Sequence, residues 1–167
     1  MEFFITALAL APTAEKDLVD IQRHICEKSH CPAALALPPV WPLFREASPP
    51  DAARRKAIRG EKLPRLCFAE YRMRGNILCA APSAPALYCD VEKSGADGQF
   101  PPRLPGFYLA DTGSSGFLQE NLYSLPPLPA YTVKALRLIV MEVITAQSVW
   151  WKAVSWKLIS EEWVKLL

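Results

Sequence analysis

The sequence contains the stretch Pro38-Pro39-Val40-Trp41-Pro42-Leu43-Phe44, and sixty-three residues after its first proline begins a second stretch, Pro101-Pro102-Arg103-Leu104-Pro105. Both stretches, here the first and second proline segments, have the pattern Pro-Pro-x-x-Pro. Proline lacks a backbone donor and is confined in sheets to strand starts and edges, so each segment predicts the start of a strand. Two such strand starts are expected at equivalent positions in the two halves of one domain. We therefore expect a cleft to which each half contributes residues.

The composition indicates one ordinary globular domain. The chain has 167 residues, of which 51% are hydrophobic and 22% charged, and this excludes a disordered or collagen-like protein. The chain has sixteen prolines but only seven glycines. That ratio predicts rigid turns and strand ends rather than flexible linkers.

The hydrophobic pattern predicts an alternation of strands and helices. Strands are expected over 3–11, 40–44, 66–71, 76–81, 86–91 and 107–110, helices over 13–28, 48–60 and 114–125, and a long final hairpin that pairs 131–143 with 149–159. The last residues, Ser160–Leu167, are expected to form a short helix or an edge strand. Because neighbouring strands can pair antiparallel, this order predicts an α+β fold with helices packed outside a split sheet.

The small net charge of +2 is unevenly distributed. Nine basic and four acidic residues lie between Arg45 and Arg74. Such a stretch either steers a phosphate-bearing partner or is an ordinary solvated helix and loop. The candidate basic patch comprises Arg54, Arg55, Lys56, Arg59, Arg72 and Arg74.

The five cysteines form no CxxC pair and no even framework, so we expect a reducing, cytoplasmic location. His24, Cys26, His30 and Cys31 lie close in sequence, but no second cluster completes a zinc site, and we expect neither a metal nor another cofactor. The apolar start of the chain lacks a basic region, and no segment reaches the roughly 18 apolar residues of a membrane span. We therefore expect no membrane partner.

Taken together, these segments resemble the two-histidine phosphoesterases, the superfamily of bacterial 2'-5' RNA ligase-like proteins and cyclic nucleotide phosphodiesterases. The likeness lies in the first strand, Phe3-Phe4-Ile5-Thr6-Ala7-Leu8, the long helix after it, the two proline segments and the final strand pair. It implies a bilobal, pseudo-twofold arrangement of antiparallel sheets around a central cleft. The single domain 1–167 would then have one lobe of about 1–47 with the C-terminal hairpin and another of about 61–125.

Members of that family carry His-x-Thr or His-x-Ser in each lobe. One histidine is the general base and the other the general acid in opening a 2',3'-cyclic or 2'-5' phosphodiester. The resemblance places Val40 and Pro42 at the first histidine and hydroxyl, and Arg103 and Pro105 at the second pair. Valine and proline cannot transfer a proton, and arginine stays protonated at any working pH, so the resemblance implies no catalytic residue here.

The residues expected to line the cleft are Val40, Pro42, Arg103, Pro105 and Tyr108, with Arg103 as the phosphate contact. Because side chains alternate along a strand, Trp41, Leu43 and Leu104 are expected to point to the opposite face.

Three functions follow from these observations. The first is a non-catalytic or altered relative that binds a phosphate-containing ligand, such as a nucleotide or an RNA end. The second is an RNA or cyclic nucleotide phosphodiesterase that uses other residues, for example Tyr108, Tyr71 or Cys67. The third is a protein-interaction module that uses the tryptophan-rich final hairpin, in which alternation puts Trp150, Lys152, Val154, Trp156 and Leu158 on one face. A tryptophan stripe of this kind also suits a core or a sheet edge, and the oligomeric state is left open.

Overall fold

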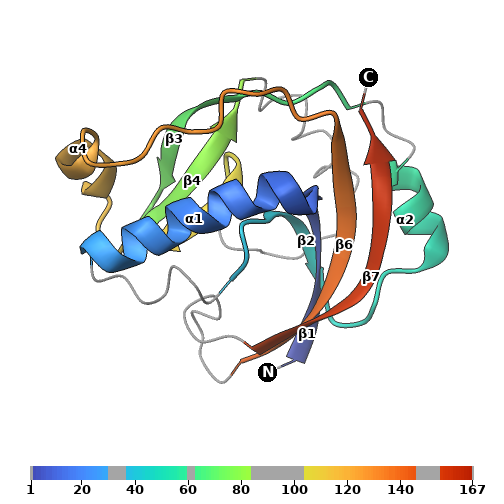
Figure 1. Cartoon of the computed structure of the whole chain (residues 1–167). Helices are drawn as coiled ribbons and strands as arrows, with labels where there is room; N and C mark the ends of the chain where they lie inside the picture. Colours follow the sequence, from blue (N-terminus) through green and yellow to red (C-terminus); the bar gives the residue numbers. More distant parts are fainter. Residues whose placement is uncertain (1, 30–36, 60–62, 84–103, 146–154, 167) are drawn as a thin grey trace.

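Two antiparallel sheets form the framework of the chain, as the computed structural model shows for residues 2–29, 37–59, 63–83, 104–145 and 155–166 (Figure 1). One sheet has four strands in the order β2-β1-β6-β7, and the other has three in the order β3-β4-β5. The expected α+β class with antiparallel sheets is therefore confirmed. None of the helices in these ranges is both long and apolar enough to cross a membrane.

The four-stranded sheet joins the two ends of the chain. It consists of β1 (Glu2–Leu10), β2 (Trp41–Glu46), β6 (Ala135–Ile144) and β7 (Ser155–Lys165). The central strands β1 and β6 are buried along most of their length, which explains why their sequences are apolar at both odd and even positions. The predicted pairing of the last two strands is confirmed, although β7 continues to Lys165 as an edge strand and the expected residues 149–154 lie outside the described ranges.

The three-stranded sheet contains β3 (Phe68–Arg74), β4 (Ile77–Pro82) and β5 (Phe107–Asp111). The hairpin of β3 and β4 was predicted, but its turn is placed differently. Arg72 and Arg74 continue β3, and the chain reverses at Gly75-Asn76, where Gly75 has a φ of 57°. A two-residue loop of this kind needs a positive φ, which glycine adopts without strain. The strand expected at 86–91 lies outside the described residues.

Three helices complete the described fold: α1 (Pro12–Ser29), α2 (Ala52–Arg59) and α4 (Phe117–Asn121). The first two agree with the sequence, and α1 buries Leu18, Ile21 and Ile25 as its spacing predicted. The third is shorter than expected. The backbone N–H and hydroxyl of Ser124 both donate to the Asn121 carbonyl oxygen, and this turn ends the helix before Leu125.

Two buried polar side chains hold α1 in place. The Gln22 amide, which is 2% exposed, donates to the carbonyl oxygens of Leu37 at 3.1 Å and Leu109 at 3.0 Å, and so links the helix to β5 and to the approach of β2. At the other end, Arg137 of β6 donates through Nε to the Leu10 carbonyl oxygen at 2.7 Å and pairs with Glu15 in the first helical turn. These contacts fix where β2 and β5 stand relative to the helix.

Gly106, directly before β5, lies against the backbone of β4. A Cβ atom placed there would be 2.2 Å from the Ala80 carbonyl oxygen, a distance that backbone atoms cannot relieve without moving the strand. We therefore expect Gly106→Ala to lower the free energy of unfolding by about 1–3 kcal/mol, measured by urea denaturation. Gly116→Ala is the matched control, because a Cβ there meets only side-chain atoms at 3.4 Å or more and its φ is −88°. Equal stability of the two variants would contradict the prediction.

Candidate functional site

The first proline segment and the described end of the second, Leu104-Pro105, lie side by side where β2 meets β5. The Tyr108 backbone N–H donates to the Val40 carbonyl oxygen at 2.9 Å. Next to this bond, the Trp41 indole N–H donates to the Leu104 carbonyl oxygen, also at 2.9 Å. These two hydrogen bonds join the four-stranded and the three-stranded sheets, and we call the place the sheet junction.

Aromatic rings fill the sheet junction. The rings of Trp41 and Phe107 have centroids 5.7 Å apart at an interplanar angle of 60°, and Phe68 meets Phe107 edge-on at 5.9 Å. Trp41 and Phe107 are almost completely buried. Tilted and edge-to-face pairs of this kind add to the stability that burial alone provides. The junction is therefore rigid and apolar, with its polar groups satisfied by backbone carbonyls.

Trp41 and Pro42 lie on opposite faces of β2, as the alternation predicted, because Trp41 pairs with Leu8 and Pro42 with Ala7. On its own face the Trp41 indole reaches the second proline segment at Leu104. Beyond Pro42 a bulge at Leu43 changes the alternation: Phe44 pairs with Thr6 and therefore shares the face of Trp41. One extra residue in a strand inverts the parity of every side chain beyond it.

The side chains proposed to line the cleft are mostly inside the protein. Val40 and Tyr108 are each 1% exposed, Pro42 is buried and Pro105 is half-buried. The Tyr108 hydroxyl accepts a hydrogen bond from the Asp111 backbone N–H at 3.1 Å. Arg103 lies outside the described residues, so its role in binding stays a prediction.

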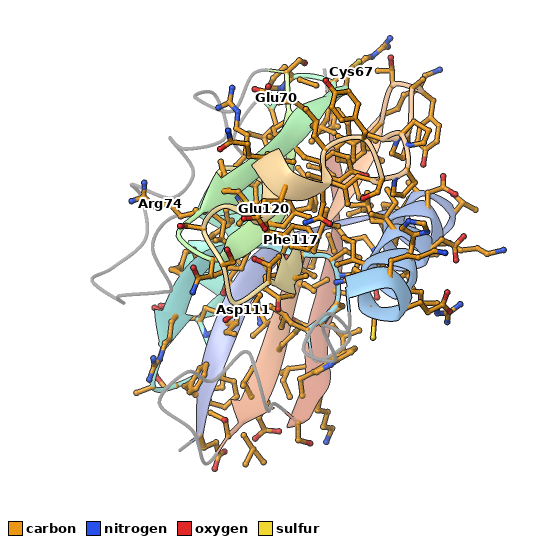
Figure 2. The ribbon with its side chains drawn as sticks, turned by 90° about the vertical axis from the view of Figure 1, so that its left-hand side faces the viewer. Cys67, Glu70, Arg74, Asp111, Phe117 and Glu120 are labelled. Atoms are coloured by element: carbon orange, nitrogen blue, oxygen red, sulfur yellow. The ribbon has the colours of Figure 1, made fainter. Side chains whose placement is uncertain are left out.

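The residues of the candidate basic patch are not brought together. The helix α2, which carries Arg54, Arg55, Lys56 and Arg59, lies beside β7, whereas β3 with Arg72 and Arg74 lies on the opposite side of the molecule, near α4 (Figure 1). Arg72 donates through Nε to Glu70 Oε1 at 2.7 Å. Arg74 points away from the sheet, and it has no ion-pair partner within the described ranges (Figure 2).

The groups considered as alternative nucleophiles are held by other contacts. The Tyr71 hydroxyl donates to the Pro126 carbonyl oxygen at 2.5 Å, and burial raises the pKa of Tyr71 to about 12, which disfavours the phenolate. The Cys67 sulfur lies 3.3 Å from the Thr132 hydroxyl. Burial also raises the pKa of the Cys79 thiol in β4. None of these groups is paired with a histidine that would activate it.

No histidine among the described residues lies at the sheet junction. The sequence has only His24 and His30; His24 lies on α1 with its Nε2 3.2 Å from the Ser124 carbonyl oxygen, and His30 lies outside the described residues. Across the described ranges, no three His, Cys, Asp or Glu side chains lie close enough together to hold a metal ion. Among the described residues, the sheet junction supplies no acid and base pair.

Two hydroxyls that the sequence reasoning passed over share one row of the four-stranded sheet. Thr6 pairs with Val140, and Val140 pairs with Ser160. The Thr6 and Ser160 hydroxyl oxygens are buried and have no hydrogen-bond partner among the described residues. They lie on the face that carries Trp41, because Thr6 is opposite Phe44. The signal in the sequence is a lone hydroxyl within the apolar run of β1, and buried polar groups of this kind call for an explanation.

The chain shares its fold with a solved protein structure. No family model matches the sequence, and no curated protein matches it. A similar solved structure is the crystal structure of LigT from Escherichia coli complexed with 3'-AMP. It covers 98% of both chains at 12% sequence identity, with a TM-score of 0.56. At this identity the likeness shows a common fold, and it extends over nearly the whole chain.

The bond from Trp41 to Leu104 should contribute measurably to stability. Trp41→Phe keeps an aromatic ring but removes the only donor that the indole offers to the buried carbonyl. We expect a loss of about 1–3 kcal/mol in the free energy of unfolding, measured by urea denaturation. Unchanged stability would show that the carbonyl finds another donor and that the sheet junction does not depend on this bond.

The raised pKa of Tyr71 predicts a loss of stability at high pH. The folded protein holds the phenol proton until about pH 12, whereas the ordinary pKa of the phenol is 10.0, so the stabilising contribution is complete below pH 10 and disappears as the pH rises toward 12. The unfolding free energy of the wild type should therefore fall more steeply in this range than that of Tyr71→Phe. Tyr123→Phe, at a fully exposed position, is the control. Parallel pH profiles for wild type and Tyr71→Phe would contradict the prediction.

Proposed function

We propose that this chain is a two-histidine-phosphoesterase-like protein that binds a phosphate-containing ligand, such as a nucleotide or an RNA end, and that has lost or altered the catalysis of that family. The observation that carries the proposal is the shared fold with LigT, whose structure was solved with 3'-AMP and covers 98% of this chain. The placement of the two proline segments at one sheet junction supports it, because both halves of the fold then contribute to one site.

The chemistry of the chain argues for binding rather than turnover. Positioned acids and bases accelerate reactions by about 10²- to 10⁴-fold, and histidine is the usual residue for this role. At the positions that the family resemblance assigns to the histidines, this chain has Val40 and Arg103. Val40 is buried, and the hydroxyls of Tyr71 and Tyr108 are engaged in hydrogen bonds. These residues therefore provide no substitute for the acid and base pair.

We assign the phosphate contact to Arg103. A guanidinium stays charged at any working pH and matches the geometry of phosphate oxygens. The residue after Arg103 is Leu104, whose carbonyl oxygen is fixed by Trp41, and this anchors one end of the second proline segment. The buried hydroxyls of Thr6 and Ser160 add neutral donors on the face of the sheet that carries Trp41.

The cellular location in this proposal is the cytoplasm. Within the described ranges Cys26, Cys67 and Cys79 are free thiols, a state typical of a reducing compartment.

The test is a binding titration with 3'-AMP, 2',3'-cyclic AMP and a short RNA ending in a phosphate, at about 50 mM salt, where phosphate contacts are strongest. We expect binding of at least one of these, and Arg103→Ala should weaken it about tenfold, since a charge-assisted hydrogen bond is lost. Arg23→Ala is the matched control, because Arg23 is an exposed arginine on α1.

Two results would overturn the proposal. Absence of binding for all three probes at low salt would contradict the proposal of a phosphate-containing ligand. Equal weakening of binding by Arg103→Ala and Arg23→Ala would contradict the assignment of the phosphate contact to Arg103. Incubation with the cyclic nucleotide decides the catalytic status: we expect no turnover, and turnover that disappears in Arg103→Ala would establish the phosphodiesterase alternative instead.

A further inference from the structure

A proline-rich segment joins α4 to β6. We call it the α4–β6 connection, and its sequence is Ser124-Leu125-Pro126-Pro127-Leu128-Pro129-Ala130-Tyr131. It runs along the outside of the molecule and contains no helix or strand (Figure 1). Residues 125–130 make no backbone–backbone hydrogen bond with another described residue. Prolines fix φ near about −65°, and an extended chain without internal hydrogen bonds is typical of polyproline II.

The burial of the α4–β6 connection repeats every three residues. Ser124, Pro127 and Ala130 are exposed, and the two residues between each of these and the next are half-buried. A polyproline II helix has three residues per turn, so this repeat is the one expected when such a helix lies along a protein surface. Leu125 and Leu128, three residues apart, pack against the hydrophobic core. One edge of the connection therefore faces inward and two edges face outward.

Side-chain hydrogen bonds hold the α4–β6 connection in place. The Tyr71 hydroxyl of β3 donates to the Pro126 carbonyl oxygen at 2.5 Å. At the other end, the Tyr131 hydroxyl donates to Asp17 Oδ2 of α1, also at 2.5 Å. A segment that is already fixed in an extended form loses little conformational freedom when a partner binds it.

From this arrangement we infer that the α4–β6 connection is the binding site of a protein module that recognises polyproline II, of the SH3 or WW kind. Such modules hold Pro-x-x-Pro segments in a groove lined by aromatic side chains. A groove contacts two of the three edges of a polyproline II helix, and the third edge points away from it. Here Pro126-Pro127 and Pro129-Ala130 lie on the two outward edges, and the two leucines take the third.

The chemistry of the surface favours such a module over a charged partner. The α4–β6 connection contains no charged residue, so it offers no cation to a phosphate or a nucleic acid. Leu122 and Tyr123, directly before it, are 51% and 100% exposed and extend the apolar surface. The contact area of a short segment is small, which predicts a weak and transient complex. None of its residues belongs to the sheet junction, so the inference does not depend on the ligand proposed above.

The test is calorimetric titration of the full chain with a panel of purified SH3 and WW domains. We expect at least one domain to bind with a Kd below about 100 μM, as suits a small interface. Pro127→Ala should weaken this binding about tenfold, because a central contact of the groove is lost. Ala130→Glu should weaken it by a similar factor, because the groove would have to desolvate a carboxylate. Both side chains are exposed, so we expect both variants to fold.

The matched control is Pro49→Ala. Pro49 is an exposed proline next to a second proline, as Pro127 is, but it lies outside the α4–β6 connection. It should leave binding unchanged. Circular dichroism checks that each variant folds. Amide NMR of the wild-type chain provides a second measurement that needs no variant, because shift changes on addition of the domain should concentrate within residues 124–131.

Three results would overturn the inference. The first is absence of binding to every domain of the panel. The second is binding that Pro127→Ala and Ala130→Glu, both folded, leave as tight as in the wild type, or that Pro49→Ala weakens equally. The third is a set of NMR shift changes that lies outside residues 124–131. In each of these cases the prolines serve only as a rigid spacer between α4 and β6.

Discussion

The described structure depends on two adjacent hydrogen bonds between its sheets. One runs from the Trp41 indole to the Leu104 carbonyl oxygen, and the other from the Tyr108 backbone N–H to the Val40 carbonyl oxygen. The two sheets share no continuous hydrogen-bond ladder, so these bonds and the rings around them set the relative position of the sheets together with α1 and the backbone bridge between Leu66 and Val133. A neutral donor that meets a buried carbonyl is specific in direction as well as favourable in energy. Trp41 thus contributes to the architecture of the chain, and its ring and that of Phe107 fill the space at the sheet junction.

A consistent chemical picture follows from this arrangement. The groups with nucleophilic potential in the described ranges donate to carbonyls, accept from backbone N–H groups or lie in apolar surroundings that favour their neutral forms. Proton transfer needs the opposite: a group whose two protonation states have similar free energies at working pH. The fold shared with LigT does not by itself specify a chemistry, since the framework and the reacting groups are separate features of a chain.

Much of the fold was predictable because its strands and helices have strong local patterns. The apolar run of β1, the spacing of Leu18, Ile21 and Ile25 in α1, and the glycine turn after β3 each identify an element. The opposite faces of Trp41 and Pro42 were predictable from alternation, but the directions of side chains beyond the bulges in β2 and β7 were not. The position of a bulge is set by pairing with another strand rather than by the residues of the bulged strand itself. The basic residues, close in sequence, were separated for a similar reason: α2 and β3 belong to different sides of the molecule.

The pairing of β1 with β6 has a consequence for how the chain is made. Glu2 pairs with Ile144 and Leu10 with Leu136, so β1 finds its central neighbour only after α1, β2 and the whole three-stranded sheet have been synthesised. Until then β1 can use only β2 on one side and α1 above it, and its other backbone edge stays open. Contacts of such high sequence separation slow folding and leave apolar strands open to wrong partners. A protein truncated before β6 would therefore leave the buried strand β1 without its central neighbour.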